Sequence, residues 1–217
     1  QLVTILKEKS AVKVVDLRPP LIAAKPLNQL YYKTDTHWNY YGAFEAYKYT
    51  LKEVFPGLSP MCFSTVSHML EAGSKIDDKT GDLIHMLKGK NTRYPKFHYL
   101  EKTCAQEVDY YNIMPDHVGV KPPEKWEKGK PSRYLFVKAC KNGKHRAIVF
   151  RDSFFSAVEG FFSEHFEVVV YIRKRYDPTI MEYLIEKINP DIVIEQIVER
   201  SLGQAPLDEI KFYEQDP

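Results

Sequence analysis

The last third of the chain alternates strand and helix patterns, and this alternation constrains the fold more than any other feature of the sequence. Apolar runs predict strands at 146–151, 166–172 and 191–197, and apolar residues at helical spacing predict helices at 154–162 and 178–188. Strands that alternate with helices form right-handed parallel βαβ units with helices packed on the sheet faces. The sequence therefore predicts an α/β fold whose ligands bind at the carboxyl ends of the strands.

The length and charge of the chain limit its organisation and its partners. With 217 residues and 44% hydrophobic content it can bury one core, so we expect a single domain over 1–217. The net charge of +2 gives no reason to expect a nucleic acid partner. No apolar run reaches the length of a membrane span, and Gln1 to Ser10 lack the basic start and apolar block of a signal peptide. We expect the chain as given to be soluble. Its start is also compatible with a piece trimmed from a longer protein.

The three cysteines are Cys62, Cys104 and Cys140, and no two of them form a CxxC pair. This spacing argues against a zinc site, and we expect neither a metal nor a cofactor. One disulfide with one free thiol and three reduced thiols both fit the count, which leaves the compartment open.

The first quarter of the chain predicts one strand, one loop and one helix. The β-branched run at 12–17 predicts a strand, and the prolines that follow it predict an extended loop towards Tyr31. From Asn39 to Phe55 apolar residues recur every three to four positions, which predicts a helix with Asn39 as its N-cap.

The region 58–140 is the least regular part of the sequence. It contains candidate short helices at 61–70 and 82–87 and candidate strands at 108–113 and 134–139. We interpret the whole region as an insertion that covers one end of the sheet.

Asp35 and His37 stand just before the predicted helix at 39–55. A histidine needs a partner that fixes its tautomer before it acts as a general base, and Asp35 is the nearest candidate. A surface pair in a polar loop is the alternative, but Trp38 is too large an apolar group for an ordinary exposed loop.

Ser153 stands where the predicted strand at 146–151 gives way to a helix. A serine at such a turn has an exposed hydroxyl and an outward backbone N–H, which suits a nucleophile with part of an oxyanion hole. A helix N-cap is the alternative role for this serine. With Asp35 and His37, it predicts an Asp-His-Ser acyl-transfer enzyme.

Other residues are candidates for binding the substrate or an oxyanion. Arg200 follows the predicted strand at 191–197, and it either binds an anionic substrate group or pairs with Glu199 or Asp152. Trp38 and nearby tyrosines such as Tyr32 are candidates to frame the site, although most of the 15 tyrosines are expected in the core.

Five blocks of sequence together resemble a known family. They are Asp35-Thr36-His37-Trp38-Asn39 with Tyr41-Gly42-Ala43, Gly81-Asp82-Leu83 with Met86-Leu87, Phe150-Arg151-Asp152-Ser153-Phe154, Asn189-Pro190-Asp191-Ile192-Val193, and Val198-Glu199-Arg200. In this order they resemble the alginate O-acetyltransferase family, which comprises SGNH-hydrolase-like, DHHW-like proteins of the AlgX and AlgJ type.

The resemblance implies a fold and three roles. The fold is the SGNH-hydrolase-like three-layer sandwich with a parallel central sheet, here with circularly permuted motif order. Strand 12–17 would then replace the last strand of the usual order, and strand 146–151 the first. Ser153 would be the nucleophile, His37 the base and Asp35 its orienting acid.

The resemblance also implies a reaction and a setting. Family members transfer acetyl groups onto hydroxyls of an exported polysaccharide outside the cytoplasmic membrane, and a membrane-bound O-acyltransferase supplies the acetyl group. A carbohydrate acetylesterase and a non-catalytic glycan-binding component of an export complex are the alternatives. Arg151 replaces the glycine of the usual Gly-Asp-Ser block, so the oxyanion donors beyond the Ser153 N–H are unassigned, with Arg151 and Arg200 among the candidates.

Overall fold

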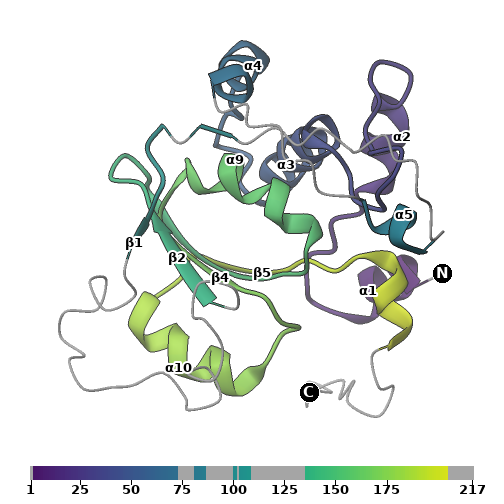
Figure 1. Cartoon of the computed structure of the whole chain (residues 1–217). Coiled ribbons are helices and arrows are strands. Elements are labelled where there is room, and N and C mark those ends of the chain that lie inside the picture. The colour runs from purple at the N-terminus through teal and green to yellow at the C-terminus, as the bar shows by residue number, and fades with distance from the viewer. Residues whose placement is uncertain (1, 73–80, 87–99, 102, 109–134, 205–217) are drawn as a thin grey trace.

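The structure is a computed structural model that describes residues 2–72, 81–86, 100–101, 103–108 and 135–204 (Figure 1). Its helices are α1 (Leu2–Lys9), α2 (Arg18–Ala24), α3 (Tyr40–Val54), α4 (Phe63–Ala72), α5 (Asp82–Met86), α9 (Glu159–Ser163) and α10 (Pro178–Ile188), with the 3-10 helices η2 (Phe154–Ala157) and η3 (Glu199–Gln204). Its strands are β1 (Gln106–Val108), β2 (Leu135–Ala139), β3 (His145–Phe150), β4 (Phe166–Ile172) and β5 (Ile192–Glu195).

The five strands form one sheet in the order β1-β2-β4-β3-β5. The neighbours β4, β3 and β5 are parallel, as the alternating pattern of the last third predicts. The predicted parallel sheet is incomplete, however, because β2 pairs antiparallel with β4, and β1 pairs antiparallel with β2, which makes the sheet mixed. The polar, turn-rich segment between β2 and β3 carries no crossover helix, which leaves β2 free to pair in the antiparallel sense.

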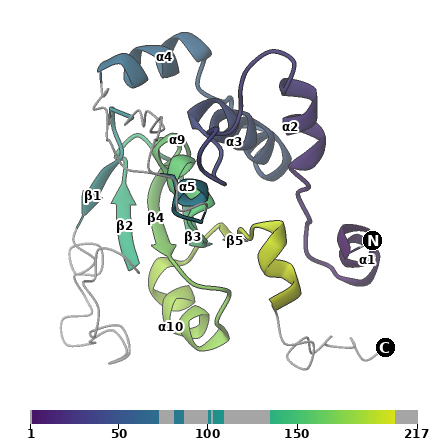
Figure 2. The ribbon, with the colours of Figure 1, turned by 45° about the vertical axis from the view of Figure 1, so that its right-hand side comes forward.

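Helices cover both faces of the sheet, so the predicted three layers are confirmed. Figures 1 and 2 show α3 and α9 over one face and α10 under the other. Along β3, Ala147 and Val149 belong to the core cluster beneath α3 and α9, and Ile148 and Phe150 to the cluster above α10. Burial on both faces explains why these strands are continuous apolar runs.

The first turn of α3 is fixed as the sequence predicts. The Asn39 side-chain oxygen accepts hydrogen bonds from the backbone N–H groups of Tyr41 and Gly42, at 3.0 and 3.1 Å. This N-cap fixes where the preceding loop, which contains Asp35 and His37, enters the helix.

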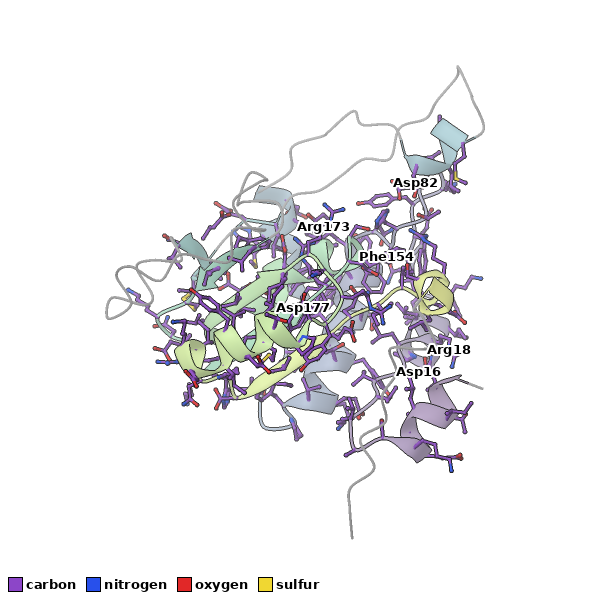
Figure 3. All side chains as sticks on the ribbon, turned by 90° about the horizontal axis from the view of Figure 1, so that it is seen from below. Asp16, Arg18, Asp82, Phe154, Arg173 and Asp177 are labelled. Carbon is purple, nitrogen blue, oxygen red and sulfur yellow. A yellow bond between two sulfur atoms is a disulfide. The ribbon has the colours of Figure 1, made fainter. Side chains whose placement is uncertain are left out.

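The predicted strand at 12–17 and the proline loop after it are wrong. Residues 13–17 have no regular structure, and Val12 is 72% exposed. Pro19 and Pro20 lie in the first turn of α2, where a proline loses no hydrogen bond and its fixed φ favours the helix. The Arg18 guanidinium donates to the Asp16 carboxylate at 2.8 Å beside this turn (Figure 3). The segment therefore cannot replace the last strand of a permuted sheet.

The described part of region 58–140 includes more of the sheet than the prediction of a covering insertion implies. The candidate helices at 61–70 and 82–87 correspond to α4 and α5, and the candidate strand at 134–139 to β2. Of the candidate strand at 108–113, only Val108 is described, as the end of β1. Both strands belong to the sheet itself. The assignment of 1–217 to one domain remains a prediction.

Two of the three cysteines form a disulfide. Cys104 is bonded to Cys140, and Cys62 is an exposed free thiol whose pKa is lowered to about 7 by hydrogen bonds from Ser64 and Thr65. Over the described residues, none of the helices has the length and apolar character that crossing a bilayer requires.

Candidate active site

A short loop that folds back on itself holds His37 ahead of α3. Tyr31 and Trp38 form an isolated antiparallel bridge. The Tyr32 N–H donates to the His37 carbonyl at 3.3 Å, and the Asn39 N–H donates to the Leu30 carbonyl at 2.8 Å. With the N-cap at Asn39, these bonds fix the backbone from which the imidazole of His37 projects.

Asp35 contacts His37 twice. Its Oδ1 lies 2.6 Å from His37 Nδ1 and also accepts the His37 backbone N–H at 2.8 Å. The Asp35 side chain is 11% exposed and the imidazole 28% exposed. The carboxylate is therefore shielded while the imidazole remains open to a reactant, as a base and its orienting acid require.

The hydroxyl of Ser153 lies on the other side of the imidazole. Ser153 Oγ is 2.7 Å from His37 Nε2, although the two residues are 116 positions apart. Ser153 occupies the N-cap position of η2, but its side chain makes no capping hydrogen bond. The observed contact of the hydroxyl is thus the one that a base and a nucleophile would make.

Asp152 fixes the turn that carries Ser153, a role that the sequence reasoning missed. Its Oδ1 accepts the Phe154 N–H at 2.8 Å, and its Oδ2 accepts the Val198 N–H at 2.6 Å. The first bond is local, and an aspartate before a helical turn could have predicted it. The second joins the turn to the segment after β5, 46 positions away, and no local pattern indicates it.

Trp38 joins the loop of His37 to the turn of Ser153. Its indole Nε1 donates to the Phe154 carbonyl at 2.9 Å, and its ring meets the Phe154 ring edge-on at 5.4 Å. The Phe154 ring lies 4.6 Å from the imidazole. Because Trp38 is only 6% exposed, it supports these groups from behind and offers little surface to a substrate.

Arg200 and Tyr32 lie at the site in different ways. The Arg200 guanidinium lies over the Phe154 ring, 5.3 Å from its centroid, and the residue is exposed. This places a positive charge beside the aromatic ring that contacts His37. Tyr32 is half-buried, and its backbone supports the His37 carbonyl.

Arg151 points into the protein. Its guanidinium donates to Ser156 Oγ at 2.7 Å, lies 3.6 Å from a carboxylate oxygen of Glu159, and stacks over Phe136. Burial lowers the pKa of Arg151, while the charge of Glu159 acts in the opposite sense. The nitrogen that donates to Ser156 also donates to the Asp152 carbonyl at 3.2 Å, so these contacts connect the nucleophile turn to the core. A part for Arg151 in binding the oxyanion or the substrate remains a prediction.

Two groups of side chains in the described ranges bring metal-ligand atoms within 4.8 Å of one another. In one of them, Cys104 and Cys140 share a disulfide, so their sulfur atoms are not thiolates. The other consists of Asp35, His37 and Asp82, and both imidazole nitrogens of His37 already have hydrogen-bond partners. The disulfide thus removes the thiolate ligands of the first group, and the contacts with Asp35 and Ser153 use both imidazole nitrogens of the second.

Comparison with known sequences places these residues in context. A family model described as "SGNH hydrolase-like domain, acetyltransferase AlgX" matches residues 2–111, just over half of the chain. The match includes Asp35 and His37 and ends before Ser153. No curated protein matches the chain.

Solved structures share the fold at low sequence identity. A DHHW family protein from Eubacterium siraeum is 20% identical with a TM-score of 0.60, and the match covers 88% of this chain and 66% of that one. PatB1 from Bacillus cereus is 18% identical with a TM-score of 0.55, covering 91% and 73%. PatB1 with a sulfonyl adduct is 19% identical with a TM-score of 0.50, covering 88% and 68%. The chain thus spans about two thirds of the length of the first of these proteins.

Proposed function

Because the chain belongs to the SGNH hydrolase-like family of the acetyltransferase AlgX, we propose that it is a serine-dependent O-acetyltransferase. It moves acetyl groups through an acetyl-serine at Ser153 onto hydroxyls of an exported polysaccharide. The observation that carries this proposal is the continuous line of contacts from Asp35 through His37 to Ser153, at 2.6 and 2.7 Å.

The first half-reaction acylates the serine. His37 Nε2 takes the Ser153 hydroxyl proton as Oγ attacks the carbonyl carbon of an acetyl ester. Asp35 holds the Nδ1–H and stabilises the imidazolium that forms. As the tetrahedral intermediate collapses, the ester bond breaks, and the leaving oxygen takes the proton from His37. The products are acetyl-Ser153 and the free alcohol of the donor.

The second half-reaction transfers the acetyl group to the acceptor. A sugar hydroxyl attacks the acetyl carbonyl while His37 takes its proton, and that proton returns to Ser153 Oγ as the enzyme ester breaks. The Ser153 N–H is the first candidate donor to the oxyanion. Arg200 is a candidate for contacting the oxyanion or the substrate, because its exposed cation lies beside Phe154.

The setting of the reaction is part of the proposal. We assign the protein to the periplasm or cell surface, where a membrane-bound O-acyltransferase supplies the acetyl group and the acceptor is a polysaccharide. The Cys104–Cys140 disulfide supports this location, because disulfides persist mainly in oxidising compartments.

Mass spectrometry of the intact protein tests the nucleophile. With p-nitrophenyl acetate we expect an adduct of about 42 Da on Ser153, absent from Ser153→Ala and present in the matched control Ser64→Ala. A sulfonyl fluoride should label the same residue, as PatB1 carries a sulfonyl adduct. Equal turnover by the wild-type protein and Ser153→Ala, with no adduct in either, would rule out the proposal.

A carbohydrate acetylesterase is the second candidate, because the 28% exposure of the imidazole also lets water reach it. Product analysis with an acetyl donor and a glycan separates the two: acetylated glycan identifies a transferase, and free acetate alone an esterase. A non-catalytic scaffold is disfavoured, because the Ser153–His37 separation is within hydrogen-bond reach.

A further inference from the structure

Helix α5 is a short segment that contacts the loop between Asp35 and His37. The Asp82 carboxylate accepts two hydrogen bonds from Thr36, one from its backbone N–H at 2.7 Å and a short one from its hydroxyl. The two residues are 46 positions apart, so this contact is tertiary. In Figure 2, α5 lies in front of the strands of the sheet.

Gly81 allows this close approach. A Cβ at Gly81 would lie 1.9 Å from the Thr34 carbonyl oxygen and 3.0 Å from Asp35 Cβ. Any larger residue would push α5 away from the loop, and with it the Asp82 carboxylate. The pair Gly81-Asp82 is therefore shaped to fit the backbone beside Asp35.

Asp82 also adds charge beside the imidazole. A carboxylate oxygen of Asp82, one of Asp35 and a ring nitrogen of His37 lie within 4.8 Å of one another. Burial raises the pKa of Asp82, but the Thr36 hydrogen bonds and the nearby His37 outweigh it, so the pKa is lowered from its ordinary 3.8. The group is thus a carboxylate at neutral pH.

We infer that Asp82 is a positioning residue of this site, which clamps Thr36 so that Asp35 and His37, on either side of it, stay aligned with Ser153. Thr36 is bound through both its backbone and its side chain, so the loop cannot rotate about that residue without breaking both bonds. The Asp82 charge also favours the imidazolium that forms during proton transfer. Asp82 need not touch the reacting atoms for either effect.

This inference rests on the proposed function, and kinetics with p-nitrophenyl acetate test it. Misalignment acts on proton transfer more than on substrate binding, so Asp82→Ala should lower kcat on the order of 10- to 100-fold with KM changed less than about twofold. Asp82→Asn, which keeps one acceptor, should lose less. Thr36→Val should lower kcat, whereas Thr36→Ser, which keeps the hydroxyl, should have a kcat close to the wild-type value.

Asp177 provides the matched control. It accepts two backbone N–H groups at the start of α10, at 3.0 and 3.2 Å, on the other face of the sheet. Figure 3 shows Asp82 and Asp177 well apart. Asp177→Asn should lower the melting temperature and leave kcat unchanged. If Asp82→Ala and Asp82→Asn both keep kcat within about twofold of the wild-type value, Asp82 has no positioning role.

A second measurement needs no turnover. The His37 Nδ1–H should give a low-field proton resonance in the wild type that is shifted or lost in Asp82→Ala and in Thr36→Val. An unchanged resonance in folded Asp82→Ala overturns the positioning role even if the wild type is inactive. Absence of Ser153-dependent turnover in the wild type, with the resonance altered in Asp82→Ala, overturns the proposed function and leaves the positioning role standing.

Discussion

Asp35 contacts both the ring and the backbone N–H of His37, so its replacement can separate the fixing of the tautomer from the fixing of the loop. Asn in its place can still accept the His37 backbone N–H, but its amide can no longer enforce the Nδ1–H tautomer. We expect Asp35→Asn to lower kcat on the order of 10³- to 10⁴-fold with the fold intact. The measurement is p-nitrophenyl acetate turnover, with circular dichroism as the control for folding. A loss below about tenfold would mean that His37 needs no orienting acid.

His165 should make the free energy of unfolding depend on pH as the pH falls through 6.5. Its Nε2 lies 2.5 Å from the hydroxyl of buried Tyr47, and burial lowers the pKa of His165 from 6.5. As the pH falls through 6.5 the unfolded chain takes up this proton before the folded protein does, so the free energy of unfolding should decrease. Chemical unfolding between about pH 7.5 and 5.5 should show this slope, and His165→Phe should flatten it. Exposed His68→Gln is the control, and equal slopes in all three proteins would contradict the prediction.

At the residue scale, the sequence indicates the candidate site residues more readily than the residues that position them. Asp35 and His37 are recognisable as candidates because an acid two positions before a histidine is a local pattern, and Ser153 because it stands between a strand and a helical turn. The bonds from Asp82 to Thr36 and from Asp152 to Val198 each span 46 positions, and only the folded chain brings these groups together. Arg151 shows the converse: its place beside Ser153 suggests the site, but its side chain points to the core.

Among the elements, β1 and β2 are connected by a disulfide that should contribute to the free energy of unfolding. The Cys104–Cys140 disulfide joins the segment before β1 to the end of β2 across 36 positions. A loop of that size predicts a loss of about 3–4 kcal/mol of unfolding free energy in the double variant Cys104→Ser/Cys140→Ser. Urea unfolding measures it, with Cys62→Ser as the matched control. A difference under about 1 kcal/mol would show that the bridge adds little to the packing around it.

A helix or strand is predictable from the sequence where a single pattern of residues indicates it. The prediction fails more often where two patterns, such as strand composition and a proline helix start, compete. Strand β4 and helix α10 have the predicted bounds, because buried apolar runs and an Asp-Pro helix start leave few alternatives. The run at 12–17 has a strand composition but finds no neighbouring strand among the described residues, and the prolines after it begin a helix. Strand propensity is realised only where a partner edge is available.

For the whole molecule, the sheet order predicts a gradient of local stability. Strands β4 and β3 each have hydrogen-bonded neighbours on both sides, whereas β1 and β5 have one described neighbour each. Amide hydrogen exchange should therefore be slowest in β3 and β4 and faster in β1 and β5. Exchange followed by mass spectrometry or NMR measures this order. Equal protection across the sheet would contradict this prediction.

The bond from the Trp38 indole to the Phe154 carbonyl has a consequence for motion. It joins the loop of the base directly to the turn of the nucleophile, without passing through the sheet. Small movements of the strands should then displace His37 and Ser153 together, with little change in the distance between them. The proton that must cross between them would travel a short path that thermal fluctuation of the scaffold barely lengthens.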